Sequence, residues 1–329
     1  MKLNKYGYGK YYKNLTPKVL FCKDVLLINN FINRKVYVAY DFYKNKVLNQ
    51  WYIDKYLENF TIRKLFSFKG IYLNPFSNNI FRKIYSKLFR TKKIYLKNTD
   101  ILLLGPYSHN HFHILNDFIL RLFFLIKNNK VKRVFIPKSC EKYVKELKLN
   151  KFFKFKLKYL NNNYNYRFYN ANYLTHFENR SNNYAYRMIL KQFKSYLGIK
   201  KKSGYKNIFI LRKTKTRRIL NEKKLSAKLK KSHFHSFDFE KMSLSSQLKN
   251  SNDAKIIVGY HGSGLVNAIL FGSKNLKLIE IFNKYYQNPV FEVMAKNANI
   301  KYRKFVCKKS FLNLDCVVNE NHFLKYLNL

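Results

Sequence analysis

Short apolar runs alternate with segments of helical periodicity through the last third of the chain. The apolar runs cover residues 207–211, 233–239, 255–259, 276–282 and 300–306. The helical segments cover residues 220–231, 243–250 and 288–297, with a further helix beginning near residue 265. Strands that alternate with helices at this spacing predict a doubly wound sheet with parallel strands.

An earlier part of the chain repeats this pattern once. Residues 100–105 (DILLLG) and 131–137 (VKRVFIP) are apolar runs, and residues 112–127 between them have helical spacing. This order predicts a strand, a helix and a second, parallel strand. The first hundred residues are irregular, apart from short strand-like pieces such as residues 35–40, and the helix and turn at 184–203 are the predicted joint. Two α/β domains with a cleft between them are therefore expected, divided at residues 195 and 196.

The charge of the chain limits its partners. Sixty-six Lys and Arg residues oppose 17 Asp and Glu residues, which gives a formal net charge of +49. Asn, Ile, Tyr and Phe are abundant alongside Lys, as in proteins from AT-rich genomes, and the Lys residues are dispersed. We therefore interpret the charge as general affinity for polyanions, such as phosphorylated substrates or anionic lipid, and keep a dedicated nucleic-acid groove as the alternative.

The sequence disfavours a membrane-spanning protein and a secreted precursor. No apolar run reaches the roughly 18–20 residues that a membrane-spanning helix needs, and residues 1–13 lead into no signal-peptide core. The four cysteines, at positions 22, 140, 307 and 316, form neither a CxxC pair nor a zinc spacing. Reduced, partly buried thiols in a cytoplasmic protein are expected.

A glycine-rich turn follows the apolar run at residues 255–259. The sequence there is Gly259-Tyr260-His261-Gly262-Ser263-Gly264-Leu265. Glycines allow the backbone to approach a ligand, and the free amides that open the next helix favour an anion such as phosphate. A tight connection without a ligand gives the same pattern. Glu280, at the end of the next strand, can bind sugar or ribose hydroxyls there, or it can be a solvated strand end.

A cluster of arginines follows the run at residues 207–211. Arg212, Arg217 and Arg218 lie in the turn before a helix, although Arg is sparse elsewhere in the chain. Guanidinium groups form bidentate contacts with phosphate, and at the end of a parallel strand they would face the same cleft as the glycine-rich turn. The alternative is an ordinary basic turn in a Lys-rich chain.

A third segment contains three of the eight histidines, His109, His111 and His113. His113, Asp117 and Arg121 are spaced by four residues and therefore share one helix face. A His–Asp pair at this spacing can act in acid–base chemistry, because the carboxylate fixes the imidazole tautomer. The alternative is a capping and salt-bridge network. No carboxylate or Cys completes a metal site around these histidines, so no metal is predicted. The acidic triplet at residues 238–240, elsewhere in the chain, is interpreted as a surface turn.

These three segments, in this order, resemble the motifs of family 61 glycosyltransferases, a family with plant, animal and bacterial polysaccharide-synthesis members. The first motif is matched at His113, Asp117, Arg121 and Leu122, with Ile114 and Leu120 where the family has Trp and Pro. The second is matched at Arg212, Arg217, Arg218, Asn221 and Glu222. The third is matched at Gly259, His261, Gly262, Gly264, Leu265 and Asn267, with Ser263 in place of Ala, followed by Ile279-Glu280-Ile281.

The resemblance implies an α/β, GT-B-like fold, with two Rossmann-type domains facing a cleft, and inverting transfer from a nucleotide-sugar. It implies no metal and no cofactor, with the nucleotide-sugar as co-substrate. Residues 1–195 would form the acceptor-side domain and residues 196–329 the nucleotide-sugar-binding domain. The implied donor-binding residues are Arg212, Arg217, Arg218, Asn221, Glu222, His261, Gly262, Ser263, Gly264, Leu265, Asn267 and Glu280. Asp117 or His113 is the candidate general base, and Arg121 and His111 are acceptor-side candidates.

The expected acceptor is a glycan or a lipid-linked glycan, as in a bacterial cytoplasmic enzyme that builds capsule or lipopolysaccharide. The basic surface would hold such an enzyme at the anionic inner leaflet of the membrane. Two alternatives remain open. One is a basic nucleic-acid-binding protein whose Tyr and Phe residues stack on bases. The other is a non-catalytic relative that binds a glycan, since the Trp and Pro of the first motif are replaced.

Overall fold

The computed structural model describes residues 19–29, 37–41, 46–47, 67–68, 71–72, 91–104, 108–126, 130–161, 164–174, 184–199, 204–212, 214 and 217–327. They belong to two compact units, an N-terminal unit within residues 15–177 and a C-terminal unit within residues 178–329. Gly105, residues 1–13 and the turn at 200–203 lie outside the described residues. Within the described part of the chain, no helix is both long and apolar enough to cross a membrane.

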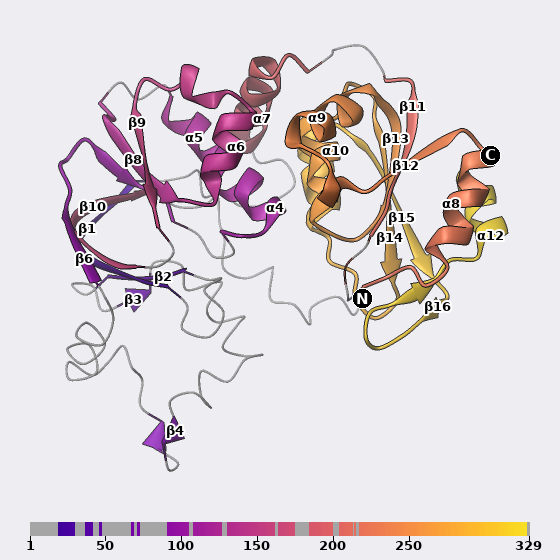
Figure 1. Ribbon diagram of the computed structural model, residues 1–329, viewed down its shortest axis with the longest axis horizontal. Coiled ribbons are helices and arrows are strands. Elements are labelled where there is room, and N and C mark those ends of the chain that lie inside the picture. The colour runs from indigo at the N-terminus through magenta and orange to yellow at the C-terminus, as the bar shows by residue number, and fades with distance from the viewer. Residues whose placement is uncertain are drawn as a thin grey trace. The chain divides into compact units, whose positions relative to one another are not determined.

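The C-terminal unit contains a sheet of five parallel strands in the order β12-β11-β13-β14-β15 (Figure 1). The strands are β11 (Lys206–Ile210), β12 (Phe234–Phe237), β13 (Ala254–Tyr260), β14 (Lys277–Asn283) and β15 (Lys301–Cys307). All five were predicted from the sequence, within three residues at each end. The prediction of parallel, Rossmann-like α/β structure is confirmed for this unit.

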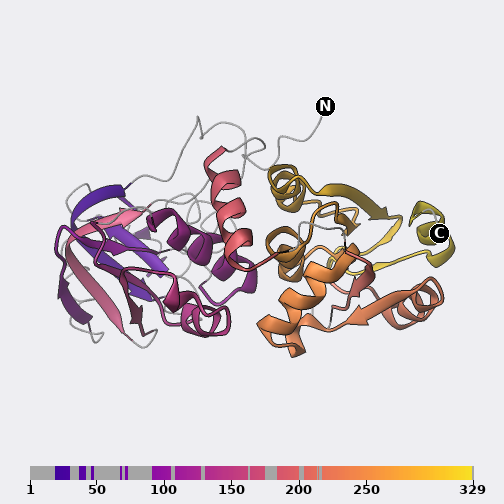
Figure 2. The same cartoon turned by 90° about the horizontal axis from the view of Figure 1, so that it is seen from above.

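Helices cover both faces of this sheet (Figures 1 and 2). The unit contains α7 (Tyr184–Tyr196), α8 (Glu222–Lys231), α9 (Leu244–Asp253), α10 (Val266–Phe271), α11 (Val290–Ala298) and α12 (Glu320–Leu327). On one face, side chains of α8 and α12 pack with the strands in one apolar core that includes Leu225, Val258 and Phe323. Because strands β13 and β14 are covered on both faces, almost every residue in them is buried, which explains their continuous apolar sequence.

The N-terminal unit contains a mixed sheet of eight strands in the order β3-β2-β1-β10-β7-β8-β9, with β6 also paired to β10. The strands are β1 (Val19–Asn29), β2 (Tyr37–Asp41), β3 (Lys46–Val47), β6 (Thr91–Tyr95), β7 (Asp100–Leu102), β8 (Arg133–Pro137), β9 (Lys156–Leu160) and β10 (Asn165–Leu174). A separate short hairpin joins β4 (Ser67–Phe68) and β5 (Ile71–Tyr72).

The predicted strand, helix and parallel strand between residues 100 and 137 are present as β7, a helical segment and β8. The helical segment is α4 (His111–His113), a π-helix η1 (Ile114–Ile119) and α5 (Leu120–Leu125). Helix α6 (Cys140–Glu146) and a short 3₁₀ turn η2 (Leu149–Lys151) follow β8. The antiparallel strands β1 to β3 were not predicted, apart from the piece that corresponds to β2.

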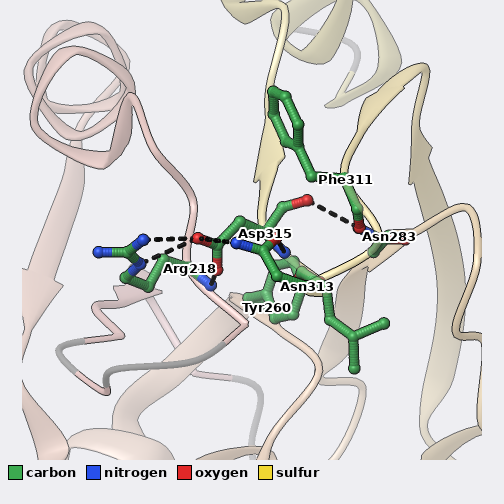
Figure 3. A network of polar contacts seen from close by, with 7 residues as sticks. Arg218, Tyr260, Asn283, Phe311, Asn313 and Asp315 are labelled. Carbon is green, nitrogen blue, oxygen red and sulfur yellow. Dashed lines mark hydrogen bonds and ion pairs between the residues drawn. The ribbon is translucent and has the colours of Figure 1, made fainter.

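A small hairpin of β16 (Lys309–Ser310) and β17 (Cys316–Val317) follows the last strand of the C-terminal sheet. It was not predicted, because two-residue strands carry no periodic signal. Its turn is held by Asn283, Tyr260 and Arg218, which come from three other segments of the unit (Figure 3).

Candidate functional site

The arginine cluster and the glycine-rich turn meet at the carboxyl edge of the C-terminal sheet. Arg212 follows β11, Gly262 follows β13, and these two strands are neighbours. The strand order reverses between β11 and β13, which is where open α/β sheets bind ligands. The sequence prediction that these two segments face one edge is therefore confirmed for Arg212 and Gly262.

The guanidinium of Arg212 lies against the backbone of Gly262. A Cβ atom placed on Gly262 would be only 1.7 Å from Nη1 of Arg212 and 2.9 Å from its Cζ. Gly262 has a φ of 175°, an extended backbone that any residue adopts. Glycine is therefore needed here for space and not for conformation, and the space is filled by a cation.

The charge of Arg212 is poorly compensated. Burial, together with the nearby positive charge of Arg217, lowers the pKa of Arg212 to about 10, and Tyr260, Glu240 and Glu222 only partly oppose this effect. Its Nε is buried and has no hydrogen-bond partner among the residues that the structure describes, while the guanidinium Cζ lies 5.8 Å from the centre of the Tyr260 ring. A buried donor without an acceptor is costly. An anion bound at this edge would supply the missing acceptor.

His261 is held by a buried chain of side chains. Nδ1 of His261 lies 2.5 Å from Oε1 of Glu280, and the hydroxyl of Tyr302 donates to Oε2 of Glu280 over 2.7 Å. Glu280 is fully buried, and His261 is 5% exposed. Burial raises the pKa of Glu280, and the hydrogen bond from His261 opposes that rise. Both carboxylate oxygens of Glu280 therefore have partners inside the protein, and the contact with Glu280 uses the Nδ1 nitrogen of His261.

Aromatic rings surround the same imidazole. His261 stacks on Phe282 with ring centres 5.2 Å apart, and it meets Tyr286 and Phe291 edge to face, with ring centres 5.3 and 5.6 Å apart. Tyr302 was missed by the sequence analysis. The strand register gives the signal that could have found it, because Tyr302 pairs with Leu278, which lies on the same face of β14 as Glu280.

The rest of the glycine-rich turn supports this arrangement. Ser263, Gly264 and Leu265 form a 3₁₀ turn, η4, that leads into α10. Leu265 is buried in the core, and Nδ2 of Asn267 donates to Gln247 of α9 over 2.8 Å. Leu265 thus holds the turn in the core, and Asn267 ties the start of α10 to α9.

Two residues of the arginine-containing motif contact the protein backbone. Oε1 of Glu222 accepts a hydrogen bond from the main-chain amide of Arg212 over 2.7 Å. Asn221 donates to the carbonyl of Val318 and accepts from its amide, at 2.7 and 3.0 Å. Glu222 therefore fixes the backbone of Arg212, and Asn221 ties this turn to the C-terminal segment.

Arg218 lies at the same edge of the sheet but has a carboxylate partner. Its Nε and Nη2 donate to Oδ2 of Asp315 over 3.0 and 2.7 Å, and its main-chain amide donates to Oδ1 over 2.8 Å (Figure 3). The guanidinium holds the pKa of Asp315 below its usual range. Arg217 has a φ of 58° and adds its charge beside Arg212. Arg212 and Arg218 thus differ, since within the described ranges the guanidinium of Arg218 has a carboxylate partner and that of Arg212 does not.

The first motif lies in the N-terminal unit, on the π-helix and the turns that flank it. Nδ1 of His113 lies 2.5 Å from Oδ2 of Asp117, and Asn116 donates to Oδ1 of Asp117 over 2.8 Å. The His113 side chain is 18% exposed and that of Asp117 is 7% exposed. A π-helix at this position is notable because such segments occur frequently at functional sites. The predicted His–Asp pair is therefore present, with the carboxylate oriented from both sides.

The two predicted acceptor-side residues have partners within the same unit. Nη1 of Arg121 donates to the carbonyls of Leu104 and Asp117 over 2.9 and 3.0 Å, and the residue is fully buried. Nδ1 of His111 lies 3.0 Å from the hydroxyl of Tyr143. Arg121 thus supports the backbone on which Asp117 lies. Across the described ranges, no three His, Cys, Asp or Glu side chains gather closely enough to hold a metal ion.

Comparisons with known proteins point to one family. The family model described as Glycosyltransferase 61 matches residues 111–279, about half of the chain. The chain is 26% identical over 82 residues to the beta-1,2-xylosyltransferase RCN11 of Oryza sativa subsp. japonica, which covers 25% of this chain and 15% of that protein. It is 36% identical over 61 residues to a beta-1,2-xylosyltransferase of Arabidopsis thaliana, 18% of this chain and 11% of that protein. The matched segments are thus a small part of both relatives, while the family match contains all three motifs.

Proposed function

The chain belongs to the glycosyltransferase 61 family, and on this premise we propose that it transfers a sugar from a nucleotide-sugar to a glycan acceptor. The observation that carries the proposal is the position of Arg212 beside the backbone of Gly262, as a desolvated guanidinium whose Nε has no partner in the described part of the chain. A diphosphate supplies the acceptors and the negative charge that this place lacks.

In this proposal Arg212 and His261 contact the diphosphate of the donor. Negative charge grows on the diphosphate as the bond to the sugar breaks, so donors that are already fixed at this edge lower the barrier. Glu280 and Tyr302 act through His261, because they hold its Nδ1 and so direct Nε2. Glu222 acts in the same indirect way on Arg212 through the main-chain amide. Transfer would need no metal, since the cationic side chains stabilise the leaving group.

The acceptor hydroxyl must lose a proton, and we assign this step to the pair of His113 and Asp117. A carboxylate at Nδ1 fixes the tautomer and raises the basicity of an imidazole, whose Nε2 then accepts a proton. The short contact between Nδ1 and Oδ2 supports this assignment. Attack by the activated hydroxyl would invert the configuration at the anomeric carbon. The N-terminal unit would then be the acceptor-side half, and the C-terminal unit the donor-binding half, of a GT-B-like enzyme.

We further propose that the acceptor is a lipid-linked glycan at the cytoplasmic face of a membrane, in the synthesis of capsule or lipopolysaccharide. The support for this is the charge of +49, which favours an anionic lipid surface. The C-terminal unit and its nucleotide-sugar would then work close to that surface.

A thermal-shift screen with free nucleotides and nucleotide-sugars tests the function. A ligand that binds the folded state alone raises the melting temperature, by an amount that grows with its concentration relative to Kd. We expect one nucleotide and its sugar conjugates to raise the melting temperature of the wild-type protein, and we expect Arg212→Met to abolish that shift. If no nucleotide or nucleotide-sugar stabilises the protein, the proposed donor site is wrong. Sugar transfer with the ligand found in the screen, measured with and without His113→Ala, then tests the catalytic assignment.

A further inference from the structure

The β16–β17 hairpin carries apolar side chains on its exposed turn. Leu312 is 82% exposed and Phe311 39% exposed, and Tyr285, from the loop after β14, is 49% exposed. The two loops are joined by a hydrogen bond from the amide of Lys284 to the hydroxyl of Ser310, 3.1 Å long. We call Tyr285, Phe311 and Leu312 together the apolar tip.

The backbone beneath the apolar tip is fixed by hydrogen bonds. The amide of Phe311 donates to the carbonyl of Asp315 over 2.9 Å, and Nδ2 of Asn283 donates to the carbonyls of Phe311 and Asp315 over 2.9 and 2.7 Å (Figure 3). Arg218 binds the buried carboxylate of Asp315, and the hydroxyl of Tyr260 donates to the carbonyl of Leu314 over 2.6 Å. Hydrogen bonds and an ion pair from three other segments therefore fix the backbone that carries the apolar tip.

Cations surround the apolar tip. Lys284, Lys308 and Lys309 are exposed beside it, and Nζ of Lys284 lies 4.8 Å from the centre of the Tyr285 ring. Asp315, the acidic residue of the hairpin, is 2% exposed and is paired with Arg218. The outer surface of the hairpin therefore combines protruding apolar groups with positive charge, on a chain whose net charge is +49.

We propose that the apolar tip inserts into an anionic lipid surface, with the three neighbouring lysines on the lipid headgroups. Apolar and aromatic groups flanked by Lys are the combination that binds the interface of such a membrane, where buried apolar area and electrostatic attraction add. Through Tyr260 the tip is tied to the end of β13, the strand that leads to Gly262. Membrane contact would thus be coupled to the donor-binding edge. The inference rests on the proposed work at a membrane and names the residues that make the contact.

Vesicle co-sedimentation of the full chain tests this. The probes are vesicles of phosphatidylcholine alone and of phosphatidylcholine mixed with phosphatidylglycerol. Wild type is expected to bind the mixed vesicles much more tightly. Leu312→Ser should weaken that binding about tenfold, the loss expected when one large apolar side chain no longer enters the acyl boundary. Tyr285→Ser should weaken it as well, and Lys308→Gln with Lys309→Gln should weaken it roughly fivefold for each Lys.

Matched variants at other sites of the same unit are the controls. Tyr205 is 70% exposed just before β11 and also has a Lys near its ring, Lys206 at 5.6 Å. Tyr205→Ser should bind mixed vesicles like wild type, as should Lys230→Gln with Lys231→Gln at the end of α8. Because all these side chains are exposed, the melting temperatures should stay close to that of wild type.

The outcomes separate the two proposals. If wild type binds neither type of vesicle, the membrane location and the role of the apolar tip are both overturned, while nucleotide binding can still stand. If wild type binds mixed vesicles and the tip variants bind them as tightly, the membrane contact lies elsewhere and the role of the tip alone is overturned. Equal losses for Leu312→Ser and Tyr205→Ser would overturn it in the same way.

Discussion

Gly262→Ala is a sharp test of the donor site, because it adds one methyl group where a guanidinium now lies. The new Cβ would be 1.7 Å from Nη1 of Arg212, so one of the two groups must move. The atoms that it meets are the far end of a long side chain, which can turn away. The φ of 175° at Gly262 is open to alanine, so the backbone has no reason to change. The substitution should therefore displace the head of Arg212 and leave the fold intact.

Gly262→Ala should weaken nucleotide binding without lowering the free energy of unfolding. A hydrogen bond to a charged group contributes about 1.5–3 kcal/mol, so losing the Arg212 contact should weaken nucleotide binding between about tenfold and about a hundredfold. Folding should not suffer. Alanine restricts the unfolded chain by about 0.4–1 kcal/mol relative to glycine, and the displaced guanidinium regains water. The free energy of unfolding should thus stay constant or rise slightly.

Isothermal titration calorimetry with the nucleotide found in the screen measures the binding loss, and urea unfolding measures stability. Gly264→Ala, two residues along the same turn, is the steric comparison. A Cβ there would lie 3.6 Å from Cγ2 of Ile210, an ordinary contact, so a much smaller loss is expected. Equal nucleotide affinity for Gly262→Ala and wild type would refute the assignment of Arg212 to the diphosphate. Loss of affinity together with loss of stability would show that the turn has collapsed.

Three further predictions follow from single contacts. Asp117→Asn should lower kcat for sugar transfer by a factor of roughly 10²–10⁴ without changing nucleotide affinity, because the amide no longer fixes the His113 tautomer; full transfer rates would remove the pair as the base. Arg218→Ala should weaken nucleotide-sugar affinity in calorimetry, with little rescue by excess acceptor, and unchanged affinity would contradict its predicted place in the donor site. Burial lowers the pKa of Lys194 to about 8, against roughly 10.4 in an unfolded chain. The unfolded state binds more protons between these values, so the free energy of unfolding should rise with pH across that window, and Lys194→Met should remove the rise in urea titrations.

The sequence predicted the C-terminal sheet well because its strands are buried on both faces. Such strands are continuous apolar runs, as in Lys277–Asn283, and each is separated from the next by a helix with its own period. The start of α9 also agrees with the predicted helix at residues 243–250: Ser243, a residue type preferred at helix starts, accepts a hydrogen bond there from the amide of Ser246. The hairpin of β16 and β17 was not, because its turn depends on Asn283, Tyr260 and Arg218, which are distant in sequence.

The N-terminal unit was harder to predict for a different reason. A mixed sheet draws its neighbours from separated parts of the chain, as in the pairing of β1 with β10, so local periodicity does not reveal the partners. Residues 112–127 were predicted as one helix, whereas Ile114–Ile119 form a π-helix. Its apolar spacing gives no sign of the wider turns. The fully buried Arg121, which follows the π-helix, donates to the carbonyl of Leu104, a contact between segments that local periodicity does not reveal.

The sequence motifs identify the residues of the candidate donor site, but they do not show which of these side chains can contact a ligand directly. The motif placed Arg212, Arg218, Glu222 and Glu280 in one class, residues that handle the donor. The structure gives three of them partners inside the protein: Asp315 for Arg218, the Arg212 amide for Glu222, and His261 with Tyr302 for Glu280. Glu222 and Glu280 can therefore influence a ligand through Arg212 and His261, whereas the side chain of Arg218 is 49% exposed. Among the described residues, none accepts a hydrogen bond from Nε of Arg212, so our proposal places the main direct contact with an anion there. Glu222 and Glu280 then set the positions of the two side chains proposed to contact the diphosphate.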